Sequence, residues 1–188
     1  MYNKNIKFKT IVLVFQYSYK KRGGFMKIDI KEIVFEKATL KEVDEIVNII
    51  HRCIMEVNSK DYESCDIDKF LAEINNEKIS SSIINKHFYV AKYYGDIVGM
   101  GAVARDSSQE SQSYFTSIFI DPNYHKMGIG RKIVEYLEGD EWCLNSKLIE
   151  IPASKTAHKF YNKLGYEYYT YPPKFKEDGS TIMYKWRE

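Results

Sequence analysis

The spacing of hydrophobic residues divides the chain into a helical part and a strand-rich part. Thr39 and Glu42 are spaced as in a capping box, in which each side chain accepts a hydrogen bond from the other residue's backbone amide at a helix start. The apolar positions that follow recur as on one face of a helix: Val43, Ile46, Val47, Ile49, Ile50 and Ile54. A second helical region is predicted after Tyr62, with the following apolar residues on one side: Ile67, Phe70, Leu71 and Ile74.

Strand-like patterns dominate elsewhere. Residues 33–38 predict a first strand, and residues 88–93 and 97–103 flank the turn residues Gly95 and Asp96, which predicts a β-hairpin. The later predicted elements are a strand at 114–120, a helix starting near Gly128, a strand at 148–151, a helix at about 156–164, and terminal strands at 166–171 and 181–186. Strands interrupted by helices are typical of an α/β or α+β domain with a mixed sheet.

Composition narrows the class of protein. A chain of 188 residues with 44% hydrophobic residues is long enough for one domain with a sizeable core. The net charge of +2 is too small to suggest a nucleic-acid partner. The three cysteines are widely spaced and predict neither a zinc site nor a disulfide framework, which favours a reducing cytoplasm. The apolar run at residues 11–15 is far shorter than the roughly 20 residues of a membrane span, so we expect no membrane partner.

Residues 1–25 carry basic side chains and no acidic ones: Lys4, Lys7, Lys9, Lys20, Lys21 and Arg22. Arg22-Gly23-Gly24 can be encoded by a purine-rich sequence that resembles a ribosome-binding site, just upstream of Met26. We therefore expect Met26 to be the physiological start, residues 1–25 to be a non-native or disordered leader, and residues 26–188 to form a single domain. The alternatives are a genuine strand at residues 6–17 and a short basic arm that contacts a membrane.

The segment at residues 117–131 combines an apolar strand, an Asp-Pro turn and a Gly-x-Gly helix entry. Gly128 and Gly130 leave backbone amides open to a ligand, since they carry no Cβ atom. The free amides and positive dipole end of a helix start suit a pyrophosphate. A Gly-x-Gly alone is weak evidence, because many helix starts use glycine for packing, and the third glycine of the dinucleotide fingerprint is missing.

The run His125-Lys126-Met127-Gly128-Ile129-Gly130 resembles the pyrophosphate loop of the GNAT superfamily of N-acyltransferases, which reads Gln or Arg, two residues, Gly, any residue, Gly or Ala. His125 departs from the pattern; it modulates affinity or is simply an exposed loop histidine. The resemblance implies that acetyl-CoA is the co-substrate, with no metal. It assigns these residues to cofactor binding: Ile118, Phe119, Ile120, His125, Lys126, Met127, Gly128, Ile129, Gly130 and Arg131.

A second segment, residues 153–166, resembles the family signature of Asn, two residues, Ala, two residues and Phe-Tyr, followed by a short helix that ends in Leu-Gly-Phe. Ser154 stands in place of the Asn and Ala157 keeps the Ala, which adds both to the cofactor site. Tyr161 matches the family's proton donor. On its own, a Phe-Tyr pair on a helix is usually core packing, but the two signatures occur in the correct order, about 30 residues apart.

The resemblance also implies a fold and a mechanism. The fold is a mostly antiparallel central sheet with one splayed strand pair, 114–120 and 148–151, flanked by about four helices. The pantetheine lies in the splay, and a backbone amide near Phe119 or Ile120 polarises the thioester carbonyl. The acetyl group passes directly to a primary amine, so no nucleophilic cysteine is required, and Tyr161 returns a proton to the departing thiolate.

Several points stay open at the level of sequence. The general base is one of Glu150, His87, Glu56 and Glu63, or water. The first two helices and Tyr62 are expected to shape the pocket of a small-molecule or peptide amine, in a monomer or homodimer. A polyamine, an aminoglycoside, an amino acid, a peptide amino terminus and a protein lysine are all compatible acceptors. The alternative functions are a non-catalytic acyl-CoA-binding or sensing protein and, less favoured, a phosphotransferase, which would require a Lys and a hydroxyl residue where Arg131 and Lys132 stand.

Overall fold

The computed structural model describes residues 28–105, 108 and 111–187. The leader hypothesis for residues 1–25 therefore lies outside the described residues. Within the described part, no helix combines the length and apolar character that a membrane crossing requires.

The described residues form seven strands in one sheet and six α-helices. The strands are β1 (Ile33–Lys37), β2 (His87–Tyr93), β3 (Asp96–Arg105), β4 (Gln112–Ile120), β5 (Leu148–Ser154), β6 (Glu167–Tyr168) and β7 (Ser180–Trp186). The helices are α2 (Val43–Glu56), α3 (Ser64–Glu73), α4 (Asn76–Asn85), α5 (Ile129–Glu138), α6 (Glu141–Leu144) and α7 (His158–Asn162). The strand order is β1-β2-β3-β4-β5-β7-β6, and every pair is antiparallel except β4 with β5. The predicted mixed, mostly antiparallel fold is confirmed.

The structure has two more α-helices than predicted, α4 and α6. Capping side chains mark where these helices begin, and neither helix carries a hydrophobic repeat. Only Ile79 of α4 is buried, and the helix begins where the Asn75 side chain accepts a hydrogen bond from the amide of Lys78. Helix α6 has four residues, and the Asp140 side chain caps it through the amide of Trp142. Neither segment carries enough apolar positions to show a helical period.

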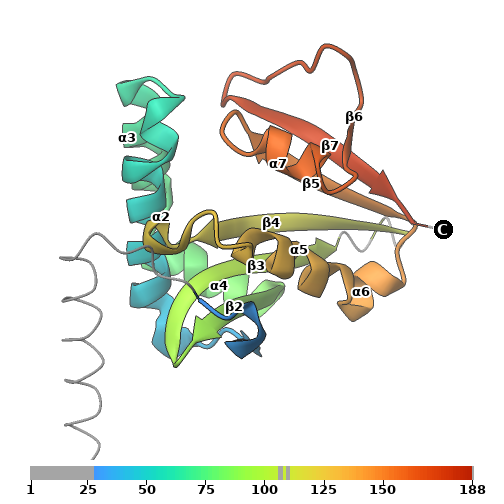
Figure 1. Ribbon diagram of the computed structural model, residues 1–188. Helices are drawn as coiled ribbons and strands as arrows, with labels where there is room; N and C mark the ends of the chain where they lie inside the picture. The colour runs from blue at the N-terminus through green and yellow to red at the C-terminus, as the bar shows by residue number, and fades with distance from the viewer. Residues whose placement is uncertain (1–27, 106–107, 109–110, 188) are drawn as a thin grey trace, which may run out of the picture.

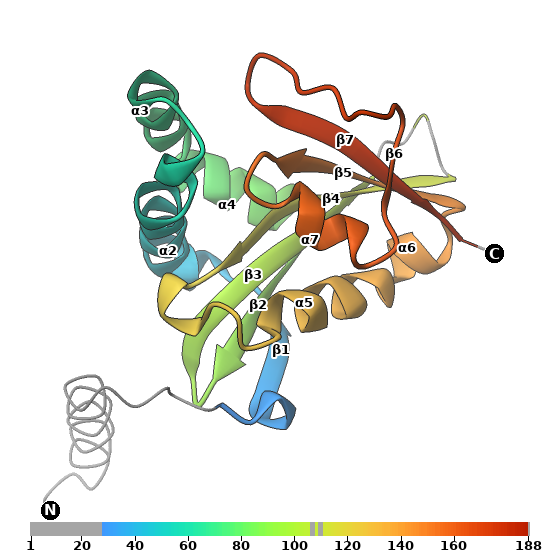
Figure 2. The ribbon, with the colours of Figure 1, turned by 45° about the horizontal axis from the view of Figure 1, so that its top comes forward.

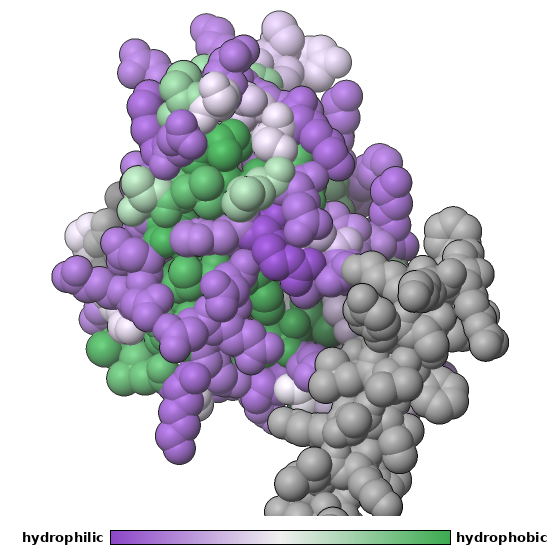
Figure 3. All heavy atoms as spheres, turned by 90° about the vertical axis from the view of Figure 1, so that its left-hand side faces the viewer, coloured by the Kyte–Doolittle hydropathy of each residue, from purple (hydrophilic) through white to green (hydrophobic). Residues whose placement is uncertain are grey.

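The predicted capping box is present at the start of α2. The amide of Thr39 donates to Glu42 Oε2 at 2.7 Å, and a 3-10 turn at Leu40–Glu42 leads into the helix. The apolar side of α2 is buried as predicted, whereas the face of the molecule built by α2 and α3 is largely hydrophilic, with smaller apolar areas between the polar ones (Figure 3).

Alternation along the central strands divides the core between the two faces of the sheet. In β2, Phe88 and Val90 belong to the core with α2 and α4, and Tyr89 and Ala91 belong to the core with α5. Helices α4 and α5 lie on opposite faces of the sheet (Figure 2). In β3, the two glycines at positions 99 and 101 allow α5 to lie directly on the strand. A Cβ atom at Gly101 would come within 2.9 Å of side-chain carbons of both Ile133 and Leu137.

Strands β4 and β5 diverge in the direction of the candidate site. Within the described residues, three register pairs join them, from Gln112 with Leu148 to Tyr114 with Glu150. Beyond that point β4 carries an extra residue relative to β3, at a bulge where Ser117 has a φ of 55°. Strands β5, β7 and β6 together with α7 form an arm that separates from β4, and the opening between them is visible in Figure 1. The predicted splay is thus present.

Helix α7 and strand β6 are shorter than predicted, whereas β7 spans the predicted strand and one residue more. Helix α7 spans five residues, and the chain leaves it through Gly165, whose φ of 89° is the left-handed conformation expected at this position. Strand β6 pairs over only Glu167 and Tyr168. Pro172 and Pro173 follow it closely and lack the amide hydrogen that a longer ladder would need.

Candidate active site

A cavity of about 460 Å³ lies between the end of β4, the start of α5 and helix α7, and we call it the cofactor-side cavity. Twelve of the thirteen residues predicted for the site line it: Ile118, Phe119, Ile120, His125, Lys126, Gly128, Ile129, Gly130, Arg131, Ser154, Ala157 and Tyr161. The exception is Met127, whose partly buried side chain packs against the hydrophobic core. Two segments separated in sequence therefore form one concave surface.

The loop before α5 has the conformation that the glycine pattern indicates. Gly128 is the N-cap residue of α5 and has a φ of 84°, which disfavours a side chain. Lys126 and Arg131 are exposed and add positive charge beside the free amides of the helix start. This end of the cavity is suited to an anion.

The structure gives a second reason for the two glycines. A Cβ atom on Gly128 would lie 2.7 Å from Ile30 Cδ1, and one on Gly130 would lie 3.1 Å from Phe160 Cζ. Both positions are therefore small because protein side chains pack there. The close approach of a ligand to these two positions stays a prediction.

His125 is more than an exposed loop histidine. Its half-buried ring places Nε2 2.8 Å from the carbonyl oxygen of Ile120, and Cys53 Sγ donates to the same oxygen at 3.0 Å. With Nε2 as the donor, the ring fastens the loop before α5 to the end of β4. The opposite side of the turn is held by Arg52, which makes two hydrogen bonds of 3.0 Å to the Asp121 carboxylate.

The strand register distinguishes the two candidate backbone amides on β4. The amide of Asp121 donates to Val98 of β3 at 3.0 Å, and the register then pairs Ile120 with Gly99 and Phe119 with Met100. Because antiparallel ladders alternate between hydrogen-bonded and non-hydrogen-bonded pairs, Phe119 bonds to β3 and Ile120 faces away from it. Ile120 is thus the better placed of the two to serve a ligand in the splay.

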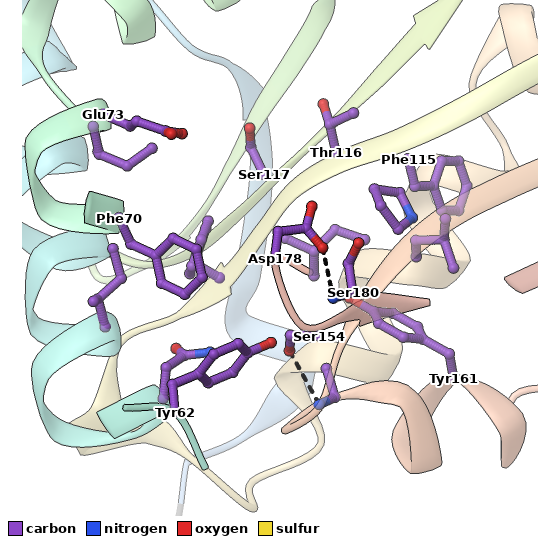
Figure 4. Close-up of a pocket in the computed structure, with 18 residues that line it drawn as sticks. Tyr62, Phe70, Glu73, Phe115, Thr116, Ser117, Ser154, Tyr161, Asp178 and Ser180 are labelled. Atoms are coloured by element: carbon purple, nitrogen blue, oxygen red, sulfur yellow. Dashed lines mark hydrogen bonds between the residues drawn. The ribbon is translucent and has the colours of Figure 1, made fainter. Parts of the chain in front are cut away.

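Tyr161 stands where the cofactor-side cavity meets a second one. Its side chain is only 5% exposed, and Figure 4 shows the ring directed from α7 toward the pocket. Among the described residues, none forms a hydrogen bond with its hydroxyl group. Burial raises the pKa of Tyr161 above its usual range, so the phenol stays protonated at neutral pH. The Tyr161 hydroxyl thus opens onto the junction of the two cavities.

The second cavity, of about 310 Å³, lies between α3, the bulged part of β4 and the turn before β7, and we call it the acceptor-side cavity (Figure 4). It shares Asn58, Ile118, Phe119, Ser154, Ala157 and Tyr161 with the cofactor-side cavity. Tyr62 lines it as predicted. The Tyr62 hydroxyl donates to the carbonyl oxygen of Gly179 and accepts from the amide of Lys155, both at 3.0 Å, so it links α3 to the C-terminal arm.

None of the four carboxylates and imidazoles predicted as bases lines either cavity. Glu150 accepts a hydrogen bond from Tyr169, Glu56 pairs with Arg52 at 3.2 Å, and Glu63 precedes the first turn of α3. The His87 ring stacks on Trp142, with Nδ1 2.9 Å from Asp140 Oδ2. Glu150, Glu56 and His87 are therefore engaged in other contacts.

The carboxylates that do line the acceptor-side cavity are not among the residues predicted from the sequence. Its carboxylates are Glu73, at the end of α3, and Asp178, in the turn before β7. Asn58 lies at the junction of the two cavities. No local pattern marks these residues, because each comes from a different element, and the fold alone brings them together.

Solved structures with a similar fold are known. The PaiA N-acetyltransferase from Thermoplasma acidophilum, in complex with coenzyme A, superimposes with a TM-score of 0.69 at 13% identity, over 82% of this chain and 99% of that chain. A GCN5-related N-acetyltransferase from Rhodopseudomonas palustris gives 0.70 at 16% identity, over 87% and 100%. N-acetylglutamate synthase from Neisseria gonorrhoeae, complexed with coenzyme A and L-arginine, gives 0.60 at 11% identity, over 82% of this chain and 33% of that chain.

No curated protein matches the sequence. At these identities the structural likeness shows a shared fold. The sequence model of the acetyltransferase (GNAT) domain, however, matches residues 58–185, more than half of the chain and both signature segments. The chain therefore belongs to the acetyltransferase (GNAT) family.

Proposed function

We propose that the protein transfers an acetyl group from acetyl-CoA to a primary amine by direct attack in a ternary complex. The observation that carries this proposal is the meeting of two cavities at Tyr161, in the opening between β4 and β5. One cavity ends at a helix start flanked by basic residues, and the other has a polar lining. Holding both substrates against one junction supplies the orientation that the reaction needs.

The residues of the cofactor-side cavity fit acetyl-CoA. The start of α5, with Lys126 and Arg131, suits the phosphates, and the apolar side chains of Ile118 and Ile120 suit the pantetheine chain. The thioester supplies the activated acetyl group. The Ile120 amide, which faces away from β3, can donate to the carbonyl oxygen as negative charge develops on it.

Tyr161 is assigned to the departing sulfur. The raised pKa keeps the phenol protonated at neutral pH, so that it can donate a hydrogen bond to the thiolate as the C–S bond breaks. The attacking amine has to lose its proton to water or, through water, to a carboxylate at the outer part of the acceptor-side cavity. Because water can take the proton of the amine, the proposal requires no basic side chain beside Tyr161.

A covalent acyl-enzyme on cysteine is disfavoured. Cys53 lines the cofactor-side cavity, but burial raises the pKa of its thiol to about 12, and its S–H group already donates to the Ile120 carbonyl. The thiolate is the nucleophilic form of cysteine, so Cys53 is unsuited to attack a thioester at neutral pH.

The test is a panel of primary amines incubated with acetyl-CoA, with release of free thiol as the readout and mass spectrometry of the amine product as confirmation. We expect amine-dependent thiol release. Tight acetyl-CoA binding by calorimetry without turnover of any amine would instead support the non-catalytic binding or sensing protein. Absence of acetyl-CoA binding would contradict both functions.

A further inference from the structure

We infer that Asp61 is a positioning residue, which holds the start of α7 and thereby places Tyr161 relative to the backbone amide of Ile120. This inference rests on the proposed function, because in that reaction both groups have to reach the same thioester. Tyr161 belongs to the arm and Ile120 to β4, on opposite sides of the splay. Their separation therefore depends on the contacts that join the two sides.

A group of hydrogen bonds, which we call the clasp, joins the connection between α2 and α3 to the arm. Thr156 Oγ1 donates to Asp61 Oδ2 at 2.7 Å, across 95 residues of sequence. Beside this contact, the Tyr62 hydroxyl accepts from the amide of Lys155 and donates to the carbonyl oxygen of Gly179, and Figure 4 shows Tyr62 on the α3 side of the pocket. The β4–β5 ladder lies at the start of β5 and the clasp follows its end, so the clasp bridges the open end of the splay.

On one side, Asp61 is tied to the end of β4. Its amide donates to the carbonyl oxygen of Asn58 at 2.8 Å and so closes the 3-10 turn that follows α2. Helix α2 is joined to β4 by Cys53, whose Sγ donates to the carbonyl oxygen of Ile120 at 3.0 Å. Asp61 therefore belongs to the side of the splay that carries the Ile120 amide.

On the other side, Thr156 is tied to Tyr161. Thr156 immediately precedes Ala157, the N-cap residue of α7, and the amide of Tyr161 donates to the Ala157 carbonyl oxygen at 3.3 Å. About one helical turn thus separates the clasp from the Tyr161 phenol. Since a misplacement of about 1 Å in a reacting group can cost roughly 10² in rate, a contact at the start of α7 is well placed to influence turnover.

The alternative is that the clasp only stabilises the fold. Asp61 is exposed, and an exposed polar contact contributes little to the free energy of unfolding. The two roles therefore predict different results when the contact is removed. A stabilising role changes the melting temperature and leaves kcat as it is, whereas a positioning role lowers kcat with little change in melting temperature.

Asp61→Ala removes the acceptor of the Thr156 hydrogen bond. With an amine identified by the panel above, we expect kcat to fall about tenfold while acetyl-CoA affinity, measured by calorimetry, stays within about twofold. Asp44→Ala is the matched control: Asp44 is exposed, accepts from Asn76 Nδ2 at 2.6 Å and lines neither cavity, so kcat should not change. A kcat for Asp61→Ala equal to or above that of the parent would overturn the inference.

Two variants of Thr156 separate the hydrogen bond from packing, since Thr156 itself lines the cofactor-side cavity. Thr156→Val keeps the shape of the side chain and loses the donor, so its kcat should match that of Asp61→Ala. Thr156→Ser keeps the hydroxyl group and should retain the kcat of the parent. Equal losses in both Thr156 variants would assign the effect to packing and would refute the role of Asp61.

A double-mutant cycle identifies the group through which Asp61 acts. Residues that act on one reacting group give non-additive effects when both are changed. If Asp61 places the phenol, adding Asp61→Ala to Tyr161→Phe should change kcat by no more than about twofold. The full tenfold loss in the Tyr161→Phe background would show that Asp61 does not act through Tyr161.

Amide hydrogen exchange keeps the test independent of turnover. The amides of residues 157–162 should exchange faster in Asp61→Ala than in the parent and in Asp44→Ala, because the start of α7 has lost its link to α2. If no amine is acetylated, the proposed function fails, and faster exchange still shows that Asp61 holds α7. Unchanged exchange would overturn the inference whether or not the protein is active.

Discussion

The two cavities that meet at Tyr161 are built in opposite ways. The cofactor-side cavity draws on two short runs, at residues 118–131 and 154–161, with few contributions from elsewhere. The acceptor-side cavity is assembled from α2, α3, β4, β5 and the turn before β7. A ligand with fixed phosphates can be held by backbone amides and a helix end, which a local motif encodes. A variable ligand has to be selected by side chains that only the folded chain brings together.

The largest expected effect comes from the group that both cavities share. Tyr161→Phe keeps the ring and its packing, and should lower kcat by roughly 10² to 10⁴, as for loss of a general acid, while acetyl-CoA affinity stays within a few-fold. The measurement is pre-steady-state turnover with an identified acceptor and chemistry rate-limiting.

Tyr166→Phe is the control for this variant, because Tyr166 is fully buried, donates to Glu138 at 3.0 Å and lines neither cavity. It should cost about 1 kcal/mol of stability and leave kcat unchanged. Turnover near that of the parent in Tyr161→Phe would show that Tyr161 only packs, and that water protonates the thiolate.

A smaller effect is expected on the cofactor side alone. Gly128→Val forces a branched residue into a φ of 84°, at a cost of about 1 to 2 kcal/mol, and should weaken acetyl-CoA binding about tenfold by calorimetry. Gly95→Val carries the same type of backbone penalty at a φ of 91°, in a hairpin turn with open space around it. Equal acetyl-CoA affinity in the two variants would contradict the assignment of the loop.

Tyr62→Phe tests the acceptor side alone and should act more weakly. It leaves the amide of Lys155 and the carbonyl of Gly179 without their side-chain partner, and loosens the turn that carries Asp178. We expect a lower melting temperature and a few-fold higher KM for the amine, with unchanged acetyl-CoA affinity. Tyr184→Phe, which loses a 3.1 Å hydrogen bond to Glu167 outside both cavities, should leave KM unaffected.

The smallest effect is predicted for Cys53→Ser. The hydroxyl can still donate to Ile120, and direct transfer uses no thiol, so kcat should stay close to that of the parent. Iodoacetamide should label the exposed Cys65 before the buried Cys53. Loss of turnover with an intact fold would instead support a covalent acyl-enzyme intermediate on Cys53.

The sequence predicted those features of the fold and site that depend on hydrophobic periodicity or on a contiguous motif. The sheet class and the buried face of α2 follow from such signals, and all but one of the residues predicted for the site line the cofactor-side cavity. Helices α4 and α6 were missed because caps define them. The four base candidates line neither cavity, because a carboxylate in a sequence carries no sign of its eventual surroundings, and Glu73 and Asp178 come to line one cavity only through the chain's tertiary contacts.

Because the ladder between β4 and β5 is short, a ligand bound between these strands would add to the stability of the fold. Seven register pairs join β5 to β7, but only three join β5 to β4 in the described residues. The arm is therefore joined to the rest of the sheet by a short ladder. A molecule bound in the splay would contact both β4 and β5, and would hold the two strands together for as long as it stays bound. By mass action it would add about 2.7 kcal/mol of stability at a hundred times its Kd. The lifetime of the folded protein would then rise and fall with the acetyl-CoA supply, and amide hydrogen exchange along β4 and β5 would report it.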